Sequence, residues 1–163
     1  MRQLGACGAL LISLSSLTGA QSGSTAALGR ELAATEQQVW QMELKMAKCY
    51  EDRDAICFSS VADEKYIGWS RAQTARPWRA AEMRESVRAN LAAAAPGSVT
   101  DRRELLGLEV DGDIALVFFR ETSTRRDSAG VETRSVARTI HVWKRRADVW
   151  KLAGGMSSAE PAK

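Results

Sequence analysis

The sequence lacks a strong charge of either sign. It carries 23 Lys and Arg against 20 Asp and Glu in 163 residues, for a formal net charge of +3. Its short basic clusters, TDRRE (100–104) and WKRRAD (143–148), contain acidic residues and are typical of solvated turns and strand ends. Because neutralising a phosphate backbone requires clustered Lys and Arg, we predict no nucleic-acid partner.

Long apolar runs are also scarce. The uncharged run LGACGALLISLSSL (4–17) follows a short positive head and is shorter than the about 20 residues that span a bilayer. Thr18 and Ala20 then form a small-x-small cleavage pattern, and STA (24–26) offers a second. This arrangement predicts a signal peptide over 1–20, with 26 as the alternative end. We therefore expect an exported protein, periplasmic or secreted, with no stable membrane insertion after cleavage; an uncleaved membrane anchor is the alternative.

Cysteine is rare and has no metal-site spacing. Loss of the signal peptide would remove Cys7 and leave Cys49 and Cys57, with neither a CxxC motif nor a nearby histidine. We therefore expect no metal site and no cofactor. An even cysteine count in an exported protein permits a disulfide, so we predict a Cys49–Cys57 bond. Two small buried thiols are the alternative.

The periodicity of the apolar residues changes halfway along the chain. After a polar linker (21–29), helical spacing predicts a helix over 30–51, a short helix capped by Asp54, and a third helix over 78–95. A strand is expected at 65–70, and four more strands follow from Val99 onward, joined by turns such as Asp111-Gly112-Asp113. The last residues, 159–163, form a polar tail. Helices followed by an antiparallel meander predict an α+β fold.

The single histidine lies in a predicted strand, where alternate side chains share a face. His141 thus shares one face with Thr139 and Trp143, while Ile140 and Val142 lie on the other. The preceding strand is apolar on both faces, and helices can cover only one of them. We predict that a second subunit covers the other, giving a homodimer through Val117, Phe119, Ile140 and Val142. Alternatively, Val117 and Phe119 lie under a loop.

The order of these segments resembles a known superfamily. A helix, an Asp-capped short helix, VADEKYIGW (61–69), a Trp-Arg helix and strands closing on TIHVWKRR (139–146) and WKL (150–152) are similar to the nuclear-transport-factor-2-like superfamily, and within it to SnoaL-like proteins. The closing strands also resemble the calcium/calmodulin-dependent kinase association domain. The resemblance covers 30–158. It implies a cone-shaped fold with three N-terminal helices packed on a curved, mostly antiparallel sheet.

The resemblance also implies a ligand pocket at the wide end of the cone. Arginines line that pocket in the kinase association domain, and their positions match His141, Arg120 and Ser157 here, so this pocket has lost charge at Ser157. Together with the face that His141 shares, this predicts a pocket formed by Arg120, Thr139, His141, Trp143 and Ser157.

Chemistry is less well specified than the fold. The base and the oxyanion-binding tyrosine of ketosteroid isomerases match Trp69 and Met46, which cannot perform those roles, and Asp63 and Glu64 are expected to be solvated at a helix end. His141 is the remaining candidate acid or base, and no carboxylate is identifiable beside it.

The sequence therefore predicts an exported SnoaL-like small-molecule-binding protein without established catalysis. One alternative is a small lyase, isomerase or hydrolase that uses His141 on a hydrophobic substrate. The other is a dimerisation or assembly module. A carboxylate bonded to His141 in an open pocket would favour the enzyme.

Overall fold

The computed structural model describes residues 23–24, 28–69, 75–95 and 97–160. Within these ranges, three helices precede most of the sheet: α1 (Ala34–Glu51), α2 (Ala55–Val61) and α3 (Ala80–Ala93). The expected signal peptide (1–20) lies outside the described residues, as does most of the linker. Among the described residues, no helix combines the length and apolarity needed to span a membrane.

Polar side chains fix where each helix begins. Asp54 Oδ1 accepts the backbone N–H of Cys57 at 2.8 Å, which confirms the cap predicted for α2. The Glu36 carboxylate accepts the N–H of Ala33 at the start of α1, and the Glu82 carboxylate accepts the N–H of Arg79 before α3. Each acid also offsets the positive end of its helix.

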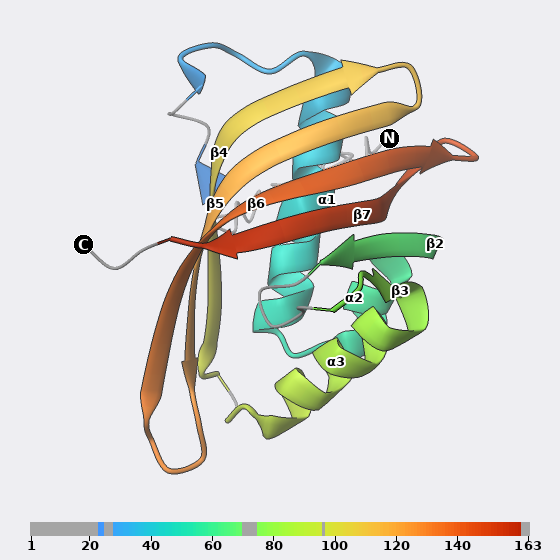
Figure 1. Cartoon of the computed structure of the whole chain (residues 1–163). Helices are drawn as coiled ribbons and strands as arrows, with labels where there is room; N and C mark the ends of the chain where they lie inside the picture. The colour runs from blue at the N-terminus through green and yellow to red at the C-terminus, as the bar shows by residue number, and fades with distance from the viewer. Residues whose placement is uncertain (1–22, 25–27, 70–74, 96, 161–163) are drawn as a thin grey trace, which may run out of the picture.

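The sheet has the strand order β1-β4-β5-β6-β7-β2-β3 in the described part of the chain. The strands are β1 (Gly23–Ser24), β2 (Ala62–Trp69), β3 (Trp78–Arg79), β4 (Val99–Asp111), β5 (Ile114–Arg126), β6 (Glu132–Arg146) and β7 (Val149–Ala159). Pairing is antiparallel except for β1 with β4 and β2 with β7. Figure 1 shows the sheet strongly bent, with α1 across one face and α2 and α3 beside β2. The predicted α+β cone is confirmed.

The inner face of the sheet, which α1 covers, carries the core. Val117 lies opposite His141, and Phe119 lies opposite Thr139, so all four side chains share this face. Val117 and Phe119 are fully buried, and Trp143 is buried beside them. The expectation that Val117 and Phe119 share a dimer face with Ile140 and Val142 is therefore wrong, because the β5–β6 register places the two pairs on opposite faces.

The outer face carries a row of apolar side chains on four adjacent strands. Trp69, Met156, Ile140 and Phe118 are successive register partners from β2 to β5, and we call them the outer apolar row. Trp69, Met156 and Phe118 are 44%, 53% and 39% exposed. Apart from Ile140, this row differs from the residues that the sequence suggested for an interface.

Two further expectations concern the ends of α1 and α2. Cys49 and Cys57 form a disulfide with their Cα atoms 5.6 Å apart, so this prediction is confirmed. In contrast, β2 begins at Ala62 and not at 65, and Asp63 belongs to the strand. Asp63 is buried and accepts a bond from Arg146 Nε at 2.9 Å, which corrects its expected solvated role.

Candidate functional site

A buried carboxylate contacts the single histidine. Nδ1 of His141, on β6, lies 2.8 Å from Oε1 of Glu43, in the middle of α1. The Glu43 side chain is completely buried, whereas that of His141 is 13% exposed. The Phe119 ring stands edge-on to the imidazole with its centroid 5.0 Å away, which fixes the plane of the ring further.

Glu43 accepts hydrogen bonds from two further side chains. Trp143 Nε1 donates to Oε1, and Arg103 on β4 donates to Oε2 and to the Glu43 backbone carbonyl. Arg103 is itself held by Asp101 through two bonds and lies over the Phe119 ring at 4.9 Å. Because indole and guanidinium groups only donate, Glu43 acts as an ionised acceptor. His141 Nδ1 therefore donates to this carboxylate, and Nε2 is the nitrogen left for a ligand.

The charges explain why an ionised Glu43 tolerates burial. Burial alone would raise the pKa of Glu43, but the adjacent His141, Arg103 and Trp143 outweigh it and hold that pKa below its ordinary value. Burial likewise would lower the pKa of Arg103, and the carboxylates of Asp101 and Glu43 raise it instead. Glu43 thus shares Arg103 with Asp101 and depends on His141 and Trp143 for its remaining hydrogen bonds.

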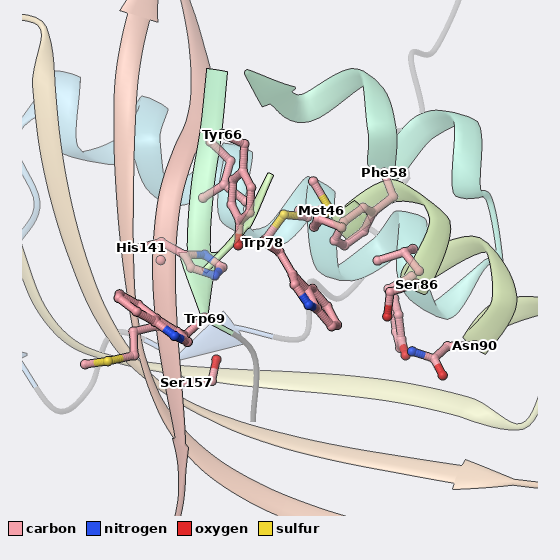
Figure 2. A pocket seen from close by; sticks show the side chains of 15 residues that line it. Met46, Phe58, Tyr66, Trp69, Trp78, Ser86, Asn90, His141 and Ser157 are labelled. Carbon is pink, nitrogen blue, oxygen red and sulfur yellow. The ribbon is translucent and has the colours of Figure 1, made fainter. Parts of the chain in front are cut away.

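Beyond His141 lies a pocket of about 220 Å³ between the bent sheet, α1, α2 and α3 (Figure 2). Among the described residues, no Asp, Glu, Lys or Arg lines the cavity, and His141 is the lining residue suited to acid–base chemistry. The lining residues are Met46, Tyr50, Phe58, Tyr66, Trp69, Trp78, Met83, Ser86, Val87, Asn90, His141, Leu152, Gly155, Met156 and Ser157. This composition suits an uncharged, largely apolar ligand.

Two paired glycines make room for the polar groups at the end of this pocket. A Cβ on Gly155 would lie 2.5 Å from His141 Cδ2, and one on Gly68 would collide with the Tyr66 hydroxyl. Gly68 and Gly155 are register partners on β2 and β7. Figure 2 accordingly shows the Tyr66 phenol and the His141 ring directed toward one another. Burial raises the pKa of Tyr66, so its hydroxyl remains a proton donor at neutral pH.

The structure brings together only some of the residues expected at the pocket. His141 and Ser157 line it. Thr139 shares the inner face but bonds Ser157 at 2.9 Å, and Trp143 is buried behind Glu43; neither is among the lining residues.

Arg120 was expected beside His141 but lies on the opposite face of the sheet. It pairs in register with Arg138, and its guanidinium contacts Glu160. The reason is again the alternation of side chains along β5, which sends Phe119 inward and Arg120 outward.

Sequence reasoning missed Glu43, Tyr66 and Arg103. A signal for Glu43 was present, because it lies four residues after Val39 and three before Met46, within the apolar stripe of α1. An acid on the buried stripe of a helix needs a partner in the core. No comparable local signal marks Arg103, whose buried position depends on how β4 crosses α1.

Comparison with solved structures identifies the fold. A candidate dehydratase of the NTF2-like family from Streptomyces avermitilis is 18% identical with a TM-score of 0.68, covering 78% of this chain and 97% of that one. A ketosteroid isomerase-like protein from Erwinia carotovora atroseptica is 13% identical with a TM-score of 0.64, covering 80% and 100%. The association domain of CaMKII from C. elegans is 14% identical with a TM-score of 0.64, covering 77% and 95%.

The chain therefore has the nuclear transport factor 2-like fold, as the sequence predicted. No protein-family model matches the sequence, and no curated protein matches it either. At these identities the likeness concerns the fold, so function has to be argued from the site.

Proposed function

We propose that this protein is an enzyme that catalyses proton transfer on a small, uncharged, hydrophobic substrate, as a lyase or an isomerase. One observation carries the proposal: the 2.8 Å contact between His141 Nδ1 and the buried Glu43, on a histidine whose ring lines an apolar pocket. A carboxylate that orients one imidazole nitrogen leaves the other free to act as base and then as acid.

The proposed chemistry uses the chain's own groups. His141 Nε2 takes a proton from a carbon or oxygen of the bound substrate, and Glu43 stabilises the imidazolium that forms. The Tyr66 hydroxyl donates a hydrogen bond to the substrate oxygen that gains negative charge. The imidazolium then returns its proton, either to another carbon, which isomerises the substrate, or to a leaving hydroxyl, which releases water. Each outcome balances without an oxidant or reductant.

The pocket supports this choice of substrate class. Aromatic and thioether side chains such as Phe58, Trp78 and Met83 form its walls, with Ser86 and Asn90 as polar groups on α3. A charged substrate would find no Asp, Glu, Lys or Arg to pair with among the described residues of the lining. The names of two similar structures, a candidate dehydratase and a ketosteroid isomerase-like protein, belong to the same reaction classes.

The test begins with a thermal-shift screen of uncharged cyclic ketones and alcohols, because a ligand of the native state raises the melting temperature. Compounds that bind are then followed for loss of water or migration of a double bond. We expect His141→Gln to retain binding and lose turnover by about a hundredfold or more. Ser135→Ala, which lies outside the pocket lining, should retain turnover.

Equal turnover in His141→Gln and the parent chain would refute the proposal that His141 catalyses proton transfer. Binding that survives with no turnover of any bound compound would instead favour a small-molecule-binding protein without catalysis, which was the first expectation from the sequence.

We also propose export and self-association. The Cys49–Cys57 disulfide supports an oxidising compartment, periplasmic or extracellular, in agreement with the signal peptide expected at 1–20. The outer apolar row supports a homodimer in which each copy covers the row of the other, since a contiguous exposed apolar strip is costly on an isolated protein.

A further inference from the structure

A second cleft, separate from the pocket, lies where α3 faces the beginning of β2 and β7. Its volume is about 660 Å³, and it is lined by charged side chains from four elements. Lys65 comes from β2, Arg84 from α3, Arg146 from β6 and Lys151 from β7. Four cations that are distant in the sequence thus converge on one surface hollow.

The carboxylates in the cleft do not neutralise these cations. Arg146 Nε bonds the buried Asp63 at 2.9 Å, so this pair accounts for one charge of each sign. The Lys151 ammonium donates a hydrogen bond to the Ser60 backbone carbonyl at 2.6 Å, and this acceptor carries no charge. Among the described residues that line the cleft, Lys65, Arg84 and Lys151 then face one further carboxylate, Glu64, which leaves a net positive charge of two.

Arg84 adds an unsatisfied donor. Its Nε is buried and has no hydrogen-bond partner within the described residues. A buried N–H without an acceptor costs free energy, so a small movement of the side chain that brings a ligand oxygen to this N–H would relieve that cost. The planar guanidinium fork matches the oxygen spacing of a phosphate or carboxylate group, and the neighbouring ammonium groups add charge without fixing the geometry.

We propose that this cleft binds a small anionic ligand through a phosphate or carboxylate group, with Arg84 as the principal contact. The site is independent of the function proposed for the pocket, although α3 borders both. A helix that supplies Arg84 to the cleft also supplies Met83 and Val87 to the pocket wall.

The test uses inorganic phosphate and the full chain. The probe is titrated while the side-chain Nε–H resonances of the arginines are recorded by NMR, with chloride at matched ionic strength as the reference, because salt screens charges without occupying a site. We expect phosphate to shift the Arg84 resonance saturably. Arg88, which is exposed on the same helix and paired with Glu85, should not respond.

Variants provide a second measurement. Arg84→Gln should weaken phosphate binding by about tenfold or more, as expected when a hydrogen bond to a charged group is lost. Arg88→Gln carries the same change of charge outside the cleft and should bind phosphate like the parent chain. If Arg84→Gln fails to fold, the resonance titration of the parent chain still decides the outcome.

The proposal is overturned if the Arg84 resonance responds equally to chloride, or if both variants lose the same affinity. Binding to phosphatidylglycerol vesicles without any response to inorganic phosphate would also overturn it, in favour of a lipid surface. Saturable phosphate binding that depends on Arg84, with no vesicle binding, supports a free small anion as the ligand.

Discussion

At the scale of single residues, the molecule depends on one acid placed where a hydrophobic side chain would normally lie. Glu43 is surrounded by three donors from β4 and β6, and each of them loses its acceptor if the carboxylate is removed. Buried charges are stable only when such partners are complete. The same carboxylate therefore stabilises the fold and orients His141.

Glu43→Gln should destabilise the protein by about 3 kcal/mol, the cost of breaking a buried charged network. The amide still accepts from Trp143, but it no longer balances Arg103. Urea denaturation followed by tryptophan fluorescence measures the difference. Glu85→Gln, which removes an exposed carboxylate paired with Arg88, is the matched control and should change stability by less than about 0.5 kcal/mol. Equal losses of stability in the two variants would contradict a stabilising role for the buried network around Glu43.

Glu43 also predicts a pH dependence. Because its pKa is lower in the folded chain than the ordinary value of 4.5, the unfolded state takes up the proton first as the pH falls. The stabilisation is therefore complete well above pH 4.5 and is lost as the pH falls through the folded pKa. Glu43→Gln should show a shallower loss of stability than the parent chain as the pH falls below 4.5. If the stability of both proteins falls in parallel with pH, Glu43 is not the source of the pH dependence.

Gly155 makes a second prediction at this scale. An alanine methyl group would lie 2.5 Å from His141 Cδ2 and 2.8 Å from the Ile140 carbonyl, so the ring or the strand has to move. We expect Gly155→Ala to destabilise the fold by about 1–3 kcal/mol and to shift the His141 imidazole resonances in NMR spectra. Gly107→Ala, whose methyl group would meet only the Phe118 ring at 3.4 Å, is the control. Unchanged His141 resonances in Gly155→Ala would show that Gly155 does not pack closely against the His141 ring.

At the scale of elements, sequence periodicity predicted which helices and strands form. It did not predict which face of each strand meets the core. The helices, the Asp54 cap and the meander followed from local patterns, and alternation along β6 correctly separated His141 from Ile140. Alternation within β5 was equally clear, but its phase relative to β6 depends on the turn that joins them after Arg126. That turn decides whether Phe118 or Phe119 faces the core. The site needed α1 as well, since Glu43 meets His141 across 98 residues.

The disulfide belongs to this scale because it joins the end of α1 to α2. It closes a loop with a sequence separation of eight residues, so we expect its removal to cost only about 2–3 kcal/mol. The double substitution Cys49→Ser and Cys57→Ser should lower the melting temperature measured by calorimetry. Addition of a reductant should lower that of the parent chain and leave the variant unchanged. A reductant effect of the same size in both would assign the loss to something other than this bond.

At the scale of the whole molecule, the two faces of the sheet have different roles. The inner face packs on α1 and holds His141, while the outer apolar row is the surface proposed to bind a second copy. Trp69 and Met156 of that row also border the pocket. Phe118→Glu should convert a dimer to monomers without unfolding, because Phe118 is 39% exposed in the single chain. Sedimentation equilibrium measures the change.

A substitution at the next residue, Phe119, should have a different effect from Phe118→Glu. Phe119→Glu places a charge in the core and should unfold the chain, since Phe119 is completely buried. Circular dichroism separates this outcome from simple dissociation. A parent chain that sediments as a monomer at micromolar concentration would contradict the proposed dimer.

The disulfide has a consequence that reaches the pocket. Each of its cysteines directly precedes an aromatic residue of the pocket wall, Tyr50 after Cys49 and Phe58 after Cys57, and the two ring centroids are 6.0 Å apart. A compound that binds between these walls more tightly in the oxidised chain makes the bond harder to reduce by the same factor. Oxidation and ligand occupancy would then be thermodynamically coupled, so that reduction of the bond would lower the fraction of molecules that hold such a ligand.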